Sequence, residues 1–195
     1  MAIGVAAQFE LLLRQKDIIG EWPKTIMDQD KAVRRGAAAF SYDGKVWTGY
    51  FTWENIPGWR WRSKTSKSKY RAAADFNLSK YSLLFPLLDA VPREERTGAI
   101  IKGEGSLPVR QSSYGKWFRQ IARAAGIPDE VWNMDSRAGG ATEAEESGVD
   151  LDAIQANLTH ADKEQTLRYI RDRSTKIAIV AEARARKRAR DDEGG

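Results

Sequence analysis

Cysteine is absent from this 195-residue chain, and histidine occurs once, at His160. The lack of cysteine excludes a disulfide-stabilised scaffold and removes the commonest ligand of structural zinc. A single histidine makes a multi-histidine metal site impossible. Any catalysis must therefore depend on arginine, lysine, tyrosine, carboxylates and one imidazole, and we expect no cofactor.

Long apolar runs are missing as well. No stretch of about 18 uncharged apolar residues occurs anywhere in the chain. The apolar opening, residues 2–13, contains Glu10 and shows no small-residue cleavage site after a long apolar run. We therefore expect a cytoplasmic protein with no membrane partner.

Charge of one sign is in modest excess. Lysine and arginine number 32 against 27 acidic residues, for a formal net charge of +5 and an isoelectric point near 9.4. With 42% hydrophobic and 30% charged residues, the composition is otherwise that of an ordinary globular domain. The basic balance favours an anionic partner, nucleic acid above all.

Apolar spacing predicts a largely helical chain with a short β segment. The stretch 23–40 is charged and irregular, with a loop expected at 34–36, and 46–50 is predicted to be a short strand. Asp150 is a good N-cap for the helix that follows it. Helices are expected over 2–21, from 81 to about 91, from Ser112 or Ser113 through 121, and over 136–146, 150–158 and 174–190.

The most informative local pattern is the alternation of aromatic and basic residues at 59–64. Side chains of a strand alternate between its two faces, so one face here is apolar and the other cationic. A turn at 65–69 and a returning strand at 70–76 would complete a hairpin with a basic tip. We expect Trp59 and Trp61 to pack in the core. The residues expected to contact DNA are Arg60, Arg62, Lys64 and Lys69.

Five segments, in order along the chain, resemble the motifs of tyrosine recombinases of the phage-integrase type. The most specific part is 148–160 followed by 166–171, in which His160 precedes Tyr169 by nine residues. Three further segments are Leu13-Arg14-Gln15-Lys16-Asp17, Trp53-Glu54-Asn55-Ile56 and Asp135-Ser136-Arg137-Ala138-Gly139-Gly140-Ala141-Thr142. The last of the five is the basic hairpin tip.

The resemblance implies an α+β, mainly helical fold, with a small antiparallel sheet near 45–78 packed on helices. It also implies that Tyr169 attacks a DNA phosphate and forms a 3′-phosphotyrosine. Arg14 and Arg137 would bind the phosphate oxygens, because guanidinium groups suit that geometry. His160 would hydrogen-bond the phosphate. A hairpin lysine would protonate the departing 5′ oxygen; Lys67 is favoured, then Lys64, then Lys69.

By the same resemblance, residues 1–183 form the catalytic domain, 184–195 form a charged tail, and the family's N-terminal DNA-clamping domain is absent. The expected partner is double-stranded DNA, on which the chain would assemble as a tetramer in the nucleoid of a bacterial host. The segment carrying Ile177, Ile179 and Val180 would contact a neighbouring protomer. Because bond energy is kept in the phosphotyrosine, rejoining would need neither ATP nor metal.

One position departs from the family pattern. The family usually has a histidine three residues before its second arginine, where this chain has Met134. Met134 and the absent N-terminal domain support one alternative to a recombinase that integrates or excises a phage or mobile element, namely a catalytically impaired DNA-binding remnant. An enzyme resembling type IB topoisomerases is a second alternative, because such enzymes share this chemistry.

Overall fold

The computed structural model describes residues 1–23, 26–34, 37–64 and 73–158, except for the side chains of Lys64, Ala73 and Glu104. The fold is α+β and mainly helical, as expected. Its helices are α1 (Ala2–Glu10), α2 (Gln15–Ile19), α3 (Ile26–Arg34), α4 (Leu84–Asp89), α5 (Gln111–Ala124), α6 (Asp135–Glu146) and α7 (Leu151–Leu158). Its strands are β1 (Ala38–Tyr42), β2 (Lys45–Gly49), β3 (Arg60–Lys64) and β4 (Ala73–Asn77).

The described strands form two separate antiparallel pairs, β1–β2 and β3–β4, rather than one sheet. The prediction that 23–40 is irregular is wrong, because α3 lies within that stretch and β1 begins in it. The signal for β1 was the turn that follows it. Asp43 and Gly44 have φ values of 49° and 66°, the left-handed geometry of a two-residue hairpin turn.

The predicted helix over 2–21 is interrupted. α1 ends at Glu10, and α2 begins at Gln15. Between them Leu11, Leu12 and Leu13 are all buried. Consecutive residues of a helix point about 100° apart, so three neighbouring leucines are buried more easily when the chain leaves the helix. It does so at Leu12, whose φ is 52°.

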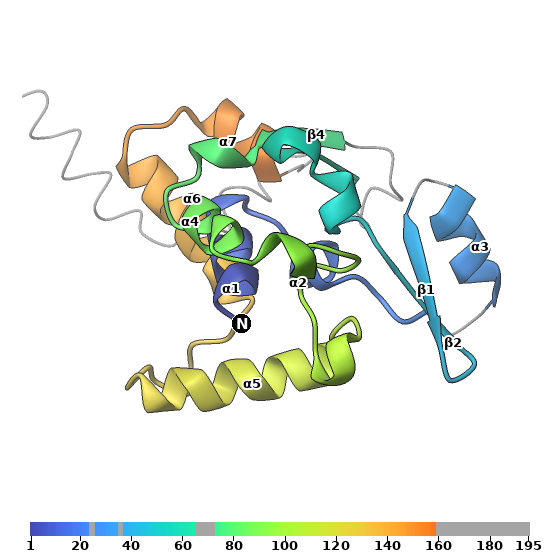
Figure 1. The fold of residues 1–195 in the computed structure, drawn as a ribbon. Helices are drawn as coiled ribbons and strands as arrows, with labels where there is room; N and C mark the ends of the chain where they lie inside the picture. The colour runs from blue at the N-terminus through green and yellow to red at the C-terminus, as the bar shows by residue number, and fades with distance from the viewer. Residues whose placement is uncertain (24–25, 35–36, 65–72, 159–195) are drawn as a thin grey trace, which may run out of the picture.

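α1 runs through the middle of the helical part of the molecule, with α4 and α6 beside it (Figure 1). α5 lies along one side, and α3 with β1–β2 projects at the end away from α6 (Figure 1). Carboxylate oxygens of Glu10 accept the N–H groups of Leu83 and Leu84, at 3.1 and 2.7 Å. This contact satisfies free donors at the start of α4 and ties α4 to α1.

The main core is aromatic around β3. The ring of Trp61 is fully buried, with its centroid 4.5 Å from that of Phe51 and 5.8 Å from that of Phe76. Its indole Nε1 donates to the carbonyl of Tyr50 at 3.0 Å. Core packing of Trp61 is thus confirmed. Trp59 packs on the core only partly, with its ring edge-on to Phe85 at 5.2 Å.

The later helices lie close to their predicted places. α6 and α7 match the predicted 136–146 and 150–158, and the Asp150 carboxylate accepts the N–H of Asp152 at 2.9 Å, as an N-cap does. α5 begins earlier than predicted, with Arg110 rather than a serine at the N-cap position. Within the described residues, no helix is long and apolar enough to cross a bilayer.

Candidate functional site

A cavity of about 470 Å³ lies between the turn after α1 and the start of α6. It brings together Arg14 and Arg137, the two arginines that the sequence assigns to phosphate binding. Lys16 is a third cation on its wall, and Asp135 is the one carboxylate among its described lining residues. The lining residues are Gln8, Leu13, Arg14, Gln15, Lys16, Gln111, Met134, Asp135, Arg137 and Ala138.

Arg137 is the third residue of α6 and is only 2% exposed. Its Nη2 donates to the carbonyl of Leu158 at 2.7 Å. That carbonyl lies at the end of α7, where a helix leaves its last carbonyl groups without helical partners. The hydrogen bond therefore holds the end of α7 against α6 and fixes the direction of a buried guanidinium.

Arg14 lines the cavity from the start of α2. It is the N-cap residue of α2, in an extended conformation with φ −73° and ψ 151°. Its carbonyl accepts the N–H of Asp17 at 2.9 Å, and the Asp17 side chain is buried. Among the described groups, none is a hydrogen-bond partner of the buried Arg14 Nη1. An anion entering the cavity would supply an acceptor to that nitrogen.

Close packing of α1 on α6 brings the two arginines to one cavity. A Cβ at Gly140 would lie within 3 Å of the carbonyl carbon of Phe9, so only glycine allows this approach. Leu12, two residues before Arg14, packs between α6 and α7 in a small apolar cluster with Ala141, Ile154 and Leu158. The arginines are thus positioned by the same contacts that fold this part of the chain.

A buried polar chain joins the same walls to α5. The Tyr114 hydroxyl donates to Gln8 Oε1 at 3.0 Å, and Gln8 Nε2 donates to the carbonyl of Asn133 at 3.2 Å. Burial raises the pKa of Tyr114 well above its usual value, so its hydroxyl stays protonated as a donor. Gln8 lines the cavity, and these two hydrogen bonds connect α1, α5 and the segment before α6.

Met134 also lines the cavity, directly before α6, and is 67% exposed. A thioether is a weak acceptor and cannot donate or take up a proton near neutral pH. The position at which the resembling family usually has an imidazole is thus open to the cavity, and its side chain has no acid–base chemistry.

The predicted cationic face of β3 is present at the surface. Arg60 Nη2 and Arg62 Nε lie 3.0 and 3.3 Å from the two carboxylate oxygens of Asp75, on β4. Slight burial of the Asp75 carboxylate raises its pKa, but the hydrogen bonds and charges of Arg60 and Arg62 outweigh this and hold the pKa below its usual range. Both arginines therefore already share one anion.

The glutamate of the tryptophan motif holds a loop in place. Glu54 Oε1 accepts the N–H of Gly98 at 2.7 Å, and the carbonyl of Gly98 accepts the N–H of Trp53 at 3.0 Å. Burial raises the pKa of Glu54, but its hydrogen bonds, with the charge of Lys102, bring the pKa below its ordinary value. The motif therefore has a structural role in the described part of the chain.

Several predicted site residues lie outside the described residues. These are Lys67, Lys69, His160 and Tyr169, and the side chain of Lys64 is likewise not described. Conversely, the sequence did not point to Gln8, Lys16 or Gln111, which line the cavity of Arg14 and Arg137. Lys16 adjoins the first arginine motif and forms an ion pair with Glu21 at 3.5 Å. Gln111 carries no sequence signal, because only the fold brings α5 to this wall.

Within the described part of the chain, no group of three histidine, cysteine or carboxylate side chains could hold a metal ion.

No protein-family model matches the sequence. No curated protein matches it either.

Solved structures do match. The Tn1549 transposon integrase in complex with transposon right-end DNA aligns over 94% of this chain, with 11% identity and a TM-score of 0.59. The same integrase with a circular intermediate DNA aligns over 93%, with 12% identity and a TM-score of 0.55. XerA recombinase is matched more weakly, with 14% identity over 93% of this chain and a TM-score of 0.49.

The chain spans 58% and 57% of the two integrase chains and 56% of the XerA chain. At these identities the likeness establishes a shared fold. The fold of the present chain is therefore that of the part of the Tn1549 integrase that it covers, as the sequence motifs predicted.

Proposed function

We propose that this chain is the catalytic part of a site-specific DNA recombinase, which cleaves and rejoins DNA through a 3′-phosphotyrosine at Tyr169. The observation that carries the proposal is the cavity in which Arg14 and Arg137 meet. Two arginines that line one cavity suit a phosphodiester, because each guanidinium can offer paired donors to anionic oxygens. The fold shared with a transposon integrase adds support.

In the proposed reaction, the phenolic oxygen of Tyr169 attacks the DNA phosphorus, its proton passes to solvent water, and the bond from phosphorus to the 5′ oxygen breaks. Arg14 and Arg137 stabilise the charge that gathers on the non-bridging oxygens. Lys67 gives its proton to the departing 5′ oxygen, and His160 donates a hydrogen bond to the phosphate. Attack by a 5′ hydroxyl on the phosphotyrosine reverses these steps and releases Tyr169.

The buried position of Arg137 fits this role. A guanidinium that is held by a backbone carbonyl does not have to be ordered when substrate binds, so its stabilisation of the transition state costs little reorganisation. The carbonyl that it holds belongs to Leu158, two residues before His160 in the sequence. Asp17, whose side chain is buried and whose N–H donates to the carbonyl of Arg14, would steady the surroundings of the phosphate rather than react.

A second candidate is a DNA-binding remnant with impaired catalysis. The observation that favours it is Met134, which leaves the cavity without an imidazole at the usual position. Both candidates bind double-stranded DNA with a marked dependence on salt, so binding alone does not separate them. Formation of a covalent adduct does, because it requires the nucleophile to act.

Covalent capture tests the proposal. Wild-type protein, Tyr169→Phe and Tyr81→Phe are incubated with a library of DNA fragments, and SDS-resistant adducts are collected and sequenced. Tyr81 is a matched control, because its ring packs on Phe76 beside α4, away from the arginine cavity. We expect adducts with wild type and Tyr81→Phe and none with Tyr169→Phe. DNA binding without any adduct from wild type would favour the remnant.

Assembly is the remaining part of the proposal. The active form would be a tetramer on double-stranded DNA, with residues 174–195 contacting a neighbouring protomer. Deleting residues 174–195 should abolish the higher-order complex in gel-shift or light-scattering experiments, while the remaining chain still unfolds cooperatively in urea. Unchanged assembly after the deletion would refute this part alone.

A further inference from the structure

A second cavity, of about 420 Å³, lies at the first turns of α5 and is closed on one side by the end of β1. It is distinct from the arginine cavity, with which it shares no lining residue. Three aromatic rings line it, those of Trp22, Tyr42 and Trp117, together with the cations Arg110 and Lys116. Its volume falls within the range of about 300–1,000 Å³ that is usual for pockets holding small ligands.

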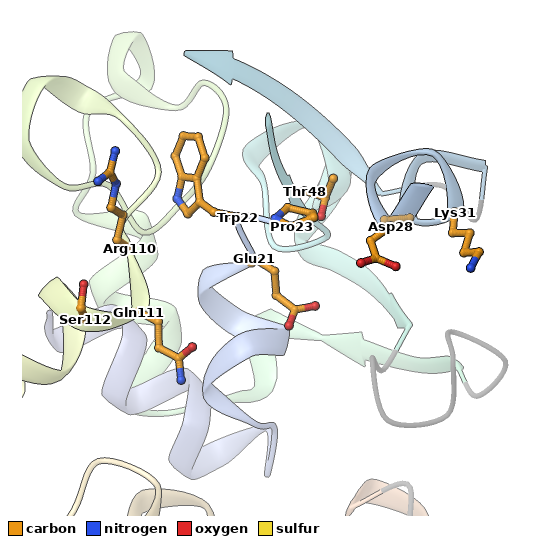
Figure 2. Close-up of a pocket in the computed structure, with 11 residues that line it drawn as sticks. Glu21, Trp22, Pro23, Asp28, Lys31, Thr48, Arg110, Gln111 and Ser112 are labelled. Atoms are coloured by element: carbon orange, nitrogen blue, oxygen red, sulfur yellow. The ribbon is translucent and has the colours of Figure 1, made fainter. Parts of the chain in front are cut away.

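Trp22 has a hydrogen-bond donor that a ligand could satisfy. Its indole Nε1 is buried, and none of the described groups accepts a hydrogen bond from it. A buried donor without an acceptor is costly, so an acceptor brought by a ligand would be favoured there. The guanidinium of Arg110 lies 5.8 Å from the centre of the same ring. The two side chains lie side by side at one end of a second, neighbouring hollow, which Figure 2 shows.

This cavity shares Trp22 and Arg110 with that neighbouring hollow, but the two differ in the charge of their other lining residues. The hollow, of about 870 Å³, lies between the start of α5 and α3, and the carboxylates of Glu21 and Asp28 line it as well as Lys31 (Figure 2). The 420 Å³ cavity has two cations and no carboxylate among its described lining residues. A ligand that fits the smaller cavity is therefore anionic and carries a flat ring to stack on the aromatic side chains.

We propose that this cavity binds one unpaired nucleotide of the DNA substrate, with its base against Trp22, Tyr42 and Trp117 and its phosphate at Arg110 and Lys116. Every base has a face that stacks on aromatic side chains, whatever the sequence. The inference rests on the proposed function, since it takes DNA as the ligand.

The place of the cavity suits a DNA strand that also reaches the arginine site. Gln111, the first residue of α5, lines the cavity of Arg14 and Arg137, and Arg110, directly before it, lines the aromatic cavity. A strand whose phosphate lies between the two arginines would thus pass the start of α5. A base that leaves the stack near that phosphate would find the aromatic rings next to the backbone that carries it.

The test compares two DNA duplexes of identical sequence, one fully paired and one with a single unpaired thymine, by fluorescence anisotropy at fixed low salt. Wild-type protein should bind the duplex with the unpaired thymine about tenfold more tightly, as stacking of one base on aromatic side chains predicts. In Tyr42→Ala this ratio should fall to near one, while affinity for the paired duplex stays unchanged. Tyr42→Phe should keep the ratio.

Phe40→Ala is the matched control. Phe40 lies two residues before Tyr42 on β1, is 41% exposed against 50% for Tyr42, and does not line the cavity. Its replacement should leave the ratio intact. Equal loss in Phe40→Ala and Tyr42→Ala would overturn the inference, as would a wild-type ratio near one while the paired duplex still binds. Failure to bind either duplex would instead remove the proposed function, and the inference with it.

A competition arm separates a nucleotide from an acidic peptide. Thymidine monophosphate and a hepta-glutamate peptide are titrated against the bound duplex that carries the unpaired thymine. We expect the nucleotide to lower the preference for this duplex at concentrations at which the peptide does not. Displacement by the peptide alone would overturn the nucleotide assignment and point to an acidic protein segment.

Discussion

Arg137 and Arg62 are both arginines that the sequence predicted to contact DNA, but the fold places them very differently. Arg137 is 2% exposed, and its guanidinium is held by the carbonyl of Leu158. The side chain of Arg62 is 84% exposed and shares the carboxylate of Asp75 with Arg60. The first is fixed by packing between helices, and the second is held by a surface ion pair of small worth.

This difference indicates which of the arginines can contribute to catalysis. A guanidinium fixed in a cavity can stabilise a transition state, because its donors are in place before substrate arrives. A solvated guanidinium that can turn between a carboxylate and a phosphate contributes to binding but orders itself on each encounter. We therefore expect substitutions at the buried site to change the rate of cleavage and those on β3 to change the affinity for DNA.

Changing arginine to lysine at each site should give the largest difference in cleavage rate between the two kinds of arginine. Arg137→Lys and Arg14→Lys keep the charge but lose the planar fork, so cleavage should slow about 1,000-fold, as for loss of an oxyanion donor. Arg62→Lys should slow it less than about threefold. Single-turnover adduct formation measures all three, with circular dichroism to show that each variant is folded. Similar losses at Arg137 and Arg62 would contradict the distinction.

The packing that fixes the buried site can be broken without touching an arginine. Gly140→Ala would press a Cβ against the backbone of Phe9, and we expect a loss of about 3 kcal/mol in the free energy of unfolding, as for overpacked cores. Gly115→Ala is the control, since a Cβ there meets nothing within 4 Å and alanine favours a helix by about 0.5–1 kcal/mol. Urea denaturation compares them; equal effects would show that α1 and α6 can separate freely.

Much of the helical fold was predictable, because α5 and α7 carry apolar residues at helical spacing, and Gly126 and Gly148 follow the ends of α5 and α6. The break after α1 was not, since three successive leucines fit a helical stripe when the residues that cover each of them are unknown. α3 and β1 were missed because the stretch is rich in charged residues and neither element buries a large apolar face; Ile26, Met27, Val33, Phe40 and Tyr42 are all exposed. The apolar and cationic faces of β3 were predicted from alternation alone, and both are present.

The site was predictable only in part. Motif order selected Arg14 and Arg137, and the fold places both on one cavity. Gln8 and Gln111 could not be selected, because each owes its place to contacts between distant segments, such as the hydrogen bond of Gln8 with Tyr114. That Asp75 would pair with Arg60 and Arg62 depended on the strand register, which places Arg62 directly opposite it. The assignments of Lys67, His160 and Tyr169 stay predictions.

Met134, the exposed residue at the arginine cavity, allows the opposite experiment, in which a proton donor is added rather than removed. Met134→His would place an imidazole where the side chain is 67% exposed, so the fold should tolerate it. If the arginine cavity is the cleavage site, the added proton donor should raise the cleavage rate about tenfold or more. Met134→Leu, which adds no donor, should leave the rate unchanged. An unchanged rate in Met134→His would mean that the phosphate does not lie next to this residue.

The smallest effect is expected on β3. Asp75→Asn removes the carboxylate that Arg60 and Arg62 share, so both become available to phosphate, and DNA affinity at low salt should rise about threefold with a steeper salt dependence. Because the arginines hold the pKa of Asp75 below its ordinary value of 3.8, wild type keeps its ion pairs throughout pH 5–8. The ratio of the two affinities should therefore be constant over that range, and the ion pairs should weaken only as the pH falls through the lowered pKa. A ratio that changes between pH 5 and 8 would show that another titrating group, rather than Asp75, controls the cations of β3.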